Sequence, residues 1–586
     1  MGFQVSPGVD VNEINATNVI PAVSTSIGGF VGSFSWGPCD EIITVGSENG
    51  LANIFGTPTL TNAKHFLTAA GFLKYGNNLK TVRVVDTAAR NASGGNTQTL
   101  VKNKDVHDAL LQTAFADHGL FIARCPGILG NAITVEMCYA DTAKAGFTNW
   151  TTYKDLFDTA PGTSDYAKNI KVGQGLTEAN AELFFDEVHI AVIDASGAIT
   201  GTPGTVLETY PFLSVCSDAK DVSGSSIFYK DVINTKSQYV FTALDDANGT
   251  DLVDTTLNSG ASVSASAATV VNTAISETAT EADLRPQTVM TDGVDAIDSL
   301  GAIVEGAMGS TGPFADSETV DVSLLFAFPL TAGVNTAMLE TAARRKDCMA
   351  MLAPPIASGD TAANAVTYAS GLTSTSYAAL CSTNGQVYDK YNDQFVWIGL
   401  GGHMAGLCAG TDDVADPWFS PAGFTRGQIF GVTKLAYAPN QAQRDDLYKA
   451  RVNPIVAFPG EGTVLYGDKT LEKKPNAFDR INVRRLFIVL EKAIATAAKY
   501  QLFEFNDEFT RAMFRNMTEP FLRDVKGRRG VTDFLVKCDE ENNTGNIIDT
   551  NQFVADIYIK PARSINFIKL NFIATRTGVD FSEIAG

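Results

Sequence analysis

The chain has 586 residues, of which 45 % are hydrophobic and 19 % are charged, and its net charge is −21. This length exceeds what one hydrophobic core supports, so we expect roughly three or four domains, and the composition argues against a disordered chain. No apolar run reaches the about 18 residues that a membrane helix needs. The eight cysteines and five histidines are scattered, without a C-x-x-C pair or an H-E-x-x-H motif, which predicts free thiols and no metal site.

The first predicted element is an N-terminal arm, residues 1–21. Val9 and Val11 alternate with polar residues after Pro7-Gly8, which is the pattern of a strand. A lone strand is not stable in water, so this strand must pair with a sheet of the same subunit or of another subunit.

An α/β pattern then predicts a middle domain built from residues 22–95 and 185–385. The predicted strands run to Phe34 and over 82–85, 188–193, 321–328 and 348–353, and the predicted helices cover 62–76 and 333–346. Two polar stretches interrupt this pattern. Residues 96–184 are acidic with short strand-like runs, which predicts an inserted, mostly β outer domain, and residues about 244–290 form a second polar insertion.

Residues 386–586 are expected to form a last domain of helices and strands. We expect a short helix capped by Asn440, a long helix after Asn482, and a helix capped by Asn506 that ends at Glu519-Pro520. In this last helix Phe509, Met513 and Met517 are expected to face inward. The predicted closing strands are 531–538, 552–559 and 565–574, and the last one carries Ile568, Leu570 and Phe572 on one face. The predicted fold is therefore multidomain, of mixed α/β and α+β class.

Motifs for catalysis are absent from the sequence. The segment from Gly462 to Thr470 resembles a phosphate-binding loop, but Asp468 stands between Gly467 and Lys469 and would oppose a phosphate. There is no G-x-S-x-G elbow and no dinucleotide-binding glycine pattern. An α/β dehydrogenase or hydrolase would need one of these features. We therefore predict no catalytic residue, no cofactor and no metal, and a protein that is not an enzyme.

Several motifs together resemble one family. They are SPGV at 6–9, DEVH at 186–189, TGTPGTVLE at 200–208, SSIFYKDVIN at 225–234, RKDC at 345–348, YDKYND at 388–393, VLYGDKT at 464–470 and INVRRLF at 481–487. In this order they resemble the contractile tail sheath proteins of bacteriophages and related injection machines. The WIGLGGH segment at 397–403 departs from the family's usual wording.

The resemblance implies a structural protein that polymerises around a tail tube and then contracts to drive the tube through the host envelope for genome ejection. The implied partners are further copies of the chain in a helical homopolymer, the tail tube protein, and the baseplate and tail terminator proteins, with no direct contact to nucleic acid and no membrane insertion. The implied location is the virion tail, assembled in the host cytoplasm. The alternative is the sheath of a phage-tail-like bacteriocin or of a type VI-like injection machine.

The charge of the chain is unevenly distributed. Residues 91–300 hold 11 Lys and Arg against 27 Asp and Glu, a balance of −16, whereas residues 469–529 hold 14 against 8, a balance of +6. A basic surface that faces an acidic tube would produce this asymmetry. The residues expected to face the tube or a subunit interface are Lys469, Lys473, Lys474, Arg484, Arg485, Arg523, Lys526, Arg528 and Arg529. Of these, Arg484 and Arg485 begin a packed helix and are the candidates for bridging neighbouring subunits.

Overall fold

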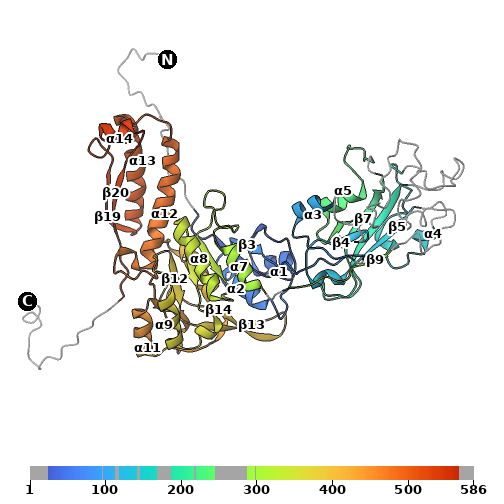
Figure 1. The fold of residues 1–586 in the computed structure, drawn as a ribbon, viewed down its shortest axis with the longest axis horizontal. Helices are drawn as coiled ribbons and strands as arrows, with labels where there is room; N and C mark the ends of the chain where they lie inside the picture. The colour runs from blue at the N-terminus through green and yellow to red at the C-terminus, as the bar shows by residue number, and fades with distance from the viewer. Residues whose placement is uncertain are drawn as a thin grey trace, which may run out of the picture.

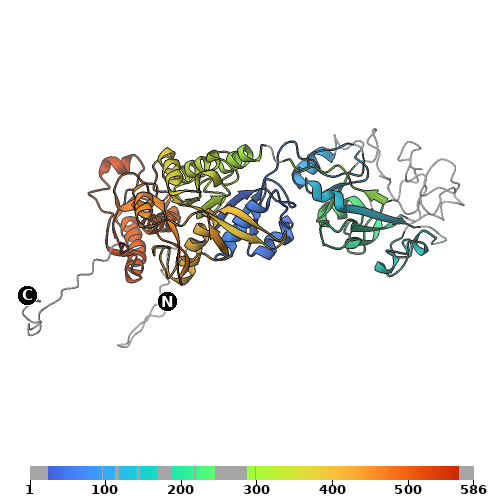
Figure 2. The same cartoon turned by 90° about the horizontal axis from the view of Figure 1, so that it is seen from below.

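The computed structural model describes residues 24–95, 97–111, 118–140, 145–167, 186–216, 219–243, 287–296 and 299–566. The molecule is elongated: a helical C-terminal unit lies at one end, a parallel sheet lies in the middle, and an antiparallel unit lies at the far end (Figure 1). The same order is seen from below (Figure 2). The arm residues Val9, Val11, Ile568, Leu570 and Phe572 lie outside the described residues, so their predicted pairing stays a prediction.

The central sheet has seven strands in the order β16-β12-β11-β10-β1-β3-β2, and β2 alone runs antiparallel to its neighbour. Its strands are β1 Gly28–Gly32, β2 Ile42–Val45, β3 Leu79–Arg83, β10 Leu324–Ala327, β11 Met349–Leu352, β12 Ala378–Cys381 and β16 Val452–Asn453. Every residue of β1, β10, β11 and β12 is buried. Strands covered on both faces by helices account for the nearly continuous apolar runs in the sequence.

Helices cover both faces of this sheet. They are α1 Glu48–Phe55, α2 Ala63–Leu73, α7 Leu300–Met308, α8 Ala332–Arg345, α9 Ala362–Gly371, α10 Gly401–Val414 and α11 Gln441–Lys449. Phe66 of α2 and Met404 of α10 belong to one buried cluster, and Met338 of α8 belongs to another cluster on the opposite face. Figure 2 shows α7 and α8 along one side of the sheet. Helices α2 and α10 approach closely because Gly402 has no side chain: a Cβ there would lie 2.3 Å from the Thr68 carbonyl oxygen.

Two predicted helix starts have different capping chemistry. At Asn440 the side chain accepts from the Gln443 amide and Gln443 returns the hydrogen bond, which forms a capping box. At Asn62 the side chain makes no cap bond. It accepts instead from the Thr59 amide at 2.8 Å and donates to the Ser35 hydroxyl at 2.9 Å, so it fixes the preceding loop.

Smaller sheets surround the central one. One has the order β14-β13-β15, with β13 Asn384–Asp389, β14 Gln394–Gly399 and β15 Val432–Leu435, and a hairpin joins β17 Ile455–Phe458 to β18 Gly462–Leu465. Short 3-10 turns are η1 Ile128–Ala132, η2 Lys154–Leu156, η4 Ile356–Ser358, η5 Ala477–Asp479 and η6 Lys499–Gln501.

The outer unit is built on an antiparallel sheet in the order β7-β6-β5-β9 and a pair β4-β8. Its elements are β4 Phe121–Ala123, β5 Ile133–Tyr139, β6 Glu187–Asp194, β7 Thr205–Ser214, β8 Val240–Thr242, β9 Gln287–Val289, α3 Lys104–Leu111, α4 Ala145–Thr148 and α5 Tyr229–Lys236. The strand predicted at 188–193 exists as β6, but its assignment to the middle α/β sheet is wrong, because β6 pairs with β5 and β7. All eight residues of β6 are buried, and a continuous apolar run does not distinguish a parallel strand from a central antiparallel one.

Arg83 lies at the junction between the central sheet and the outer unit. Its guanidinium is buried and donates to the carbonyl oxygens of Phe34 at 3.0 Å, Gly37 at 2.6 Å and Pro126 at 2.6 Å. Phe34 and Gly37 follow β1, whereas Pro126 follows β4 of the outer unit. One side chain therefore connects the two units through hydrogen bonds to backbone groups only.

The C-terminal unit consists of two long helices, a hairpin and a short helix. They are α12 Ile481–Ala498, α13 Glu508–Gly527, β19 Val531–Lys537, β20 Asp556–Pro561 and α14 Gly545–Asp549. Strands β19 and β20 pair antiparallel, and the strand predicted at 565–574 falls mainly outside the described residues.

Three details predicted for α13 are wrong. Asp507, rather than Asn506, caps the helix and accepts from the Thr510 amide at 2.8 Å. Phe509 is exposed rather than inward-facing, and Phe514 takes the buried position. Pro520 lies inside the helix instead of ending it, on an exposed face where water can hydrate the backbone group that proline leaves without a partner.

Candidate functional site at the start of helix α12

Helix α12 joins the C-terminal unit to the central sheet. Ile481 and Ile488 belong to the buried cluster of the central sheet, whereas Leu486 and Leu490 belong to the cluster of the C-terminal unit. The apolar residues of this helix therefore face two cores, which fixes its first turns between them. Its polar residues in these turns are consequently buried and need internal partners.

Arg480, the N-cap residue of α12, is paired with a buried carboxylate. Its Nη1 lies 2.9 Å from Oδ1 of Asp468, and it also contacts the Tyr448 hydroxyl. Burial opposes the guanidinium charge, but Asp468 and Tyr448 outweigh this effect and raise the pKa of Arg480. Burial, followed by the nearby Asp468 charge, raises the pKa of Tyr448.

The same carboxylate holds the last described residues of the chain. The Ser564 hydroxyl donates to Oδ2 of Asp468 at 2.9 Å, and Nδ2 of Asn566 donates to Oδ1 at 3.1 Å. Asn566 also donates to the Tyr448 hydroxyl at 2.9 Å. We call Asp468, Arg480 and Tyr448 with these two residues the C-terminal root, because residues 567–586 follow directly from it.

A second arginine of α12 holds the first described residues. Nη2 of Arg485 lies 2.6 Å from Oδ2 of Asp412, which lies on α10, and 3.3 Å from the Thr25 carbonyl oxygen. The Thr25 hydroxyl donates to the same Oδ2 at 2.6 Å. The Ser24 carbonyl oxygen accepts from the Ser323 hydroxyl at 3.0 Å. We call these five residues the N-terminal root, because residues 1–23 precede it.

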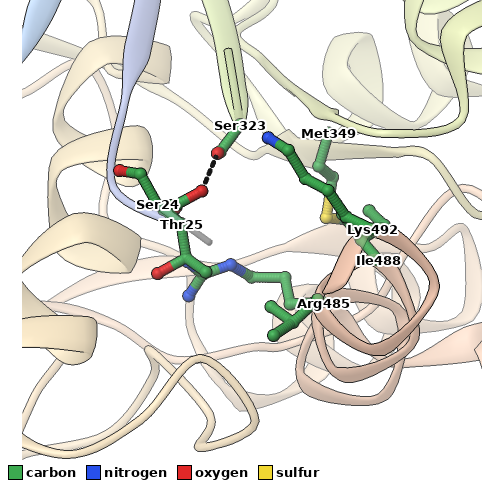
Figure 3. A pocket seen from close by; sticks show the side chains of 8 residues that line it. Ser24, Thr25, Ser323, Met349, Arg485, Ile488 and Lys492 are labelled. Carbon is green, nitrogen blue, oxygen red and sulfur yellow. Dashed lines mark hydrogen bonds between the residues drawn. The ribbon is translucent and has the colours of Figure 1, made fainter. Parts of the chain in front are cut away.

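The N-terminal root borders a small pocket between α12 and the central sheet. Figure 3 shows its lining, with Ser24 and Thr25 facing Arg485, Ile488 and Lys492 of α12. Lys492 forms an ion pair with Asp321, just before β10. No group of three or more His, Cys, Asp or Glu residues that could bind a metal occurs in the described ranges. No described helix is both long and apolar enough to cross a membrane.

The basic residues predicted at a surface fall into three groups. Arg484 and Arg485 are buried, so their expected place at a tube or subunit interface is wrong. The Arg484 guanidinium lies between the rings of Phe478 and Tyr377, 3.9 Å and 4.3 Å from their centroids, and burial lowers its pKa. Lys469 is half-buried: its Nζ donates to the Tyr448 carbonyl oxygen at 2.9 Å, and burial lowers its pKa.

The remaining six basic residues are exposed: Lys473, Lys474, Arg523, Lys526, Arg528 and Arg529. Arg528 pairs with Asp416, and its backbone oxygen accepts from the Trp418 indole at 3.1 Å. Lys526 lies 3.0 Å from Asp533. Within the described part of the chain, Arg523 and Arg529 form no ion pair.

Sequence reasoning missed the acidic members of both roots. In the sequence Asp468 interrupts a phosphate-binding loop, and its place just after the apolar run at 464–466 is the one local signal of a buried carboxylate that needs a partner. Asp412 carried no comparable signal, because its partner Arg485 lies 73 positions away in sequence.

The described chain is elongated and multidomain, and contacts with the first turns of α12 hold both its first and its last described residues. Three family models match it: the phage tail sheath C-terminal domain over residues 473–575, the phage tail sheath protein central domain over 314–471, and the tail sheath protein Gp18 domain III N-terminal region over 25–84.

Full-length relatives agree. The tail sheath protein of Vibrio phage KVP40 is 33 % identical over 99 % of this chain and 100 % of its own length. That of Enterobacteria phage T4 is 33 % identical over 99 % of both chains. The crystal structure of a sheath tail protein from Listeria innocua has a TM-score of 0.50 and 11 % identity over 93 % of this chain and 97 % of its own, which shows a similar fold. The chain belongs to the phage tail sheath protein family and is a component of a contractile phage tail.

Proposed function

We propose that this chain polymerises as the contractile sheath around a phage tail tube and contracts by subunit rearrangement to drive the tube through the host envelope for genome ejection. The observation that carries this proposal is the 33 % identity to two phage tail sheath proteins over 99 % of the chain. These relatives favour a phage tail over a bacteriocin or a type VI-like machine. The contraction requires no bound nucleotide if the extended packing is higher in free energy than the contracted packing. This difference is then summed over many subunits.

The two roots support a connection through donated strands. Within the described residues, β19 and β20 form a two-stranded sheet, which leaves one edge of each strand unpaired. A two-stranded sheet is marginally stable, and its edges are templates for further strands. Val9 and Val11 at one end, and Ile568, Leu570 and Phe572 at the other, would pair with the β19–β20 edges of neighbouring copies. Because α12 holds both roots, each subunit can rotate about this helix while its donated strands stay paired with the neighbouring copies.

The exposed basic residues are proposed to face the tube. Lys473, Lys474, Arg523 and Arg529 are solvent-exposed, and Lys526 and Arg528 are exposed but paired within the chain. Exposed ion pairs contribute about 0–1 kcal/mol each and weaken with salt, which suits a contact that must form and then release. In this arrangement the acidic outer unit points away from the tube.

Beyond the tube, the proposed partners are the baseplate and tail terminator proteins at the two ends of the sheath, with assembly in the host cytoplasm. We propose no enzymatic activity, no cofactor, no direct contact with nucleic acid and no membrane insertion. In this proposal the exposed surfaces of the described residues contact other proteins of the tail.

Negative-stain microscopy of the purified full-length chain, alone and with the tube protein of the same phage, tests the proposal. Hollow cylinders alone, or a sheathed tube in the mixture, are the expected result. A uniform small oligomer in both samples, together with hydrolytic activity, would contradict it.

A further inference from the structure

The loop between α12 and α13 presents a group of exposed apolar side chains. The exposed fractions are 76 % for Tyr500, 64 % for Leu502, 105 % for Phe503, 84 % for Phe505 and 73 % for Phe509. Exposed large apolar side chains occur elsewhere singly, but here five of them follow closely in sequence from the end of α12 into the first turn of α13, and such a group marks an interaction surface. We call these five residues the aromatic tip.

The aromatic tip is held in place rather than left to fold back. Nδ2 of Asn506 donates to the Gln552 carbonyl oxygen at 2.8 Å and to Oδ1 of Asn543 at 3.2 Å, while Nη1 of Arg511 donates to Oδ1 of Asn506 at 3.0 Å. Phe503 has a φ of 71°, a left-handed conformation that is rare for a bulky residue. Strain of this kind persists where the surroundings enforce it and is concentrated at functional positions.

A second aromatic group lies near α11, with Phe424 and Tyr466 exposed and Phe458 half-buried. Phe424, Phe458 and Tyr466 contact one another with ring centroids 5.2 to 6.0 Å apart. The Arg444 guanidinium of α11 lies 5.9 Å from the rings of both Phe458 and Tyr466. We call these four residues the aromatic–arginine patch. The patch carries a cation between aromatic rings, whereas the tip carries the exposed carboxylates of Glu504 and Glu508.

The two surfaces lie at opposite edges of the molecule, across its long axis. Helix α11 lies at the bottom of Figure 1, whereas α14 and the start of α13, which flank the tip, lie at the top. The line between them crosses the long axis that leads to the outer unit. Two different complementary surfaces at opposite edges can form a head-to-tail contact between copies, which generates an open helical filament when the rotation does not close.

We propose that the aromatic tip of one copy docks on the aromatic–arginine patch of a second copy of this chain. This inference rests on the proposed polymerisation and adds a contact that the strand arms do not supply. The tip carboxylates disfavour an acidic tube as the occupant, and they favour the guanidinium of the patch.

Site-specific cross-linking of the assembled full-length chain tests the proposal. All eight native cysteines are buried. Lys499→Cys places one thiol beside the tip and leaves both tip carboxylates in place, and Glu461→Cys places one in the exposed turn after Phe458. Mixed assemblies of these two variants, treated with a short bis-maleimide, are expected to give a dimer band. Lys499→Cys mixed with Val222→Cys, an exposed position of the outer unit, is the matched control.

Adding Phe503→Ser and Phe505→Ser to the tip variant should reduce the dimer yield by about tenfold or more, because two aromatic side chains no longer become buried. Unfolding temperature should stay unchanged, since both rings are exposed. Equal yields with the Val222→Cys control, or cross-links from the tip to the tube protein, would overturn the inference. Cylinders that form without the tip–patch band refute this contact alone, whereas a wild-type chain that forms no cylinders with its tube refutes the proposed polymerisation.

Discussion

Arg480 and Arg485 lie five positions apart at the start of α12, and each contacts a carboxylate that also holds one end of the described chain. Arg480 reaches Asp468 at 2.9 Å, and Asp468 accepts from Ser564; Arg485 reaches Asp412 at 2.6 Å, and Asp412 accepts from Thr25. One helix therefore fixes the starting points of both arms, although they are more than 500 residues apart in sequence.

Asp468→Asn should destabilise the chain and loosen the C-terminal root. Removing one partner of a buried pair typically costs about 3–5 kcal/mol, and the Asp468 side chain is almost entirely buried. Urea unfolding of the monomer measures the loss. Asp446→Asn, which breaks an exposed pair with Lys449, is the control and should cost under about 1 kcal/mol. Equal effects of the two substitutions would mean that Asp468 does not fix this root.

Deletion of residues 1–20 should leave a folded monomer that does not form cylinders. The described fold starts at Ser24, and its root contacts with Asp412 and Ser323 remain in the deletion. Circular dichroism checks folding, and microscopy checks assembly. Cylinders as abundant as those of the full-length chain would refute strand donation by this arm.

Excision of the outer unit should spare the central sheet only if the whole unit is removed. Arg90 and Val294 already exchange backbone hydrogen bonds of 3.1 and 3.0 Å, so residues 92–292 can be replaced by a short turn. We expect this variant to unfold cooperatively. Removal of 96–184 alone deletes β5 and exposes the apolar β6, so it should aggregate. A soluble, native-like 96–184 deletion would show that β6 does not need β5.

Charge-reversal substitutions distinguish a basic residue that faces the tube from one that stabilises the fold. Arg529→Glu should weaken co-sedimentation with the tube and leave the unfolding temperature unchanged, since Arg529 is exposed and forms no ion pair in the described chain. Arg528→Glu should lower stability by about 1 kcal/mol, because it places a carboxylate beside Asp416 and Asp524. Normal tube binding by Arg529→Glu would remove this residue from the proposed contact.

Stability should fall as the pH falls from about 6.5 to about 4. Burial lowers the pKa of His65 to about 4 and that of His403 to about 3, so the unfolded chain binds these protons first. The free energy of unfolding therefore has its full value above pH 6.5. As the pH falls from 6.5 toward the pKa of the folded state, it decreases by about 1.4 kcal/mol per pH unit for each histidine. Urea unfolding at several pH values measures the slope, and His65→Gln should reduce it. An unchanged slope in that variant would mean that His65 binds its proton equally well in the folded and the unfolded chain.

The sequence predicted the positions of the helices and strands better than it predicted which segments contact one another. Periodicity located α8, β10 and β11 to within a few residues, because short-range patterns determine which segments become helices or strands. It placed β6 in the wrong sheet, because strand pairing depends on residues distant in sequence. The predicted exposure of Arg485 failed for the same reason: its burial depends on Asp412, which the local pattern does not contain.

The hydrogen bonds of Arg83 have a mechanical consequence. If the outer unit separates from the sheet, the buried guanidinium keeps the carbonyl acceptors of Phe34 and Gly37 but loses that of Pro126, which leaves one of its buried N–H donors without a partner. The outer unit and the central sheet should thus move together as one rigid body. Because the outer unit lies at the far end of the molecule (Figure 1), a small rotation of the sheet would displace it by a large distance, and a fluorophore at the exposed Val222 of that unit would report this displacement during contraction.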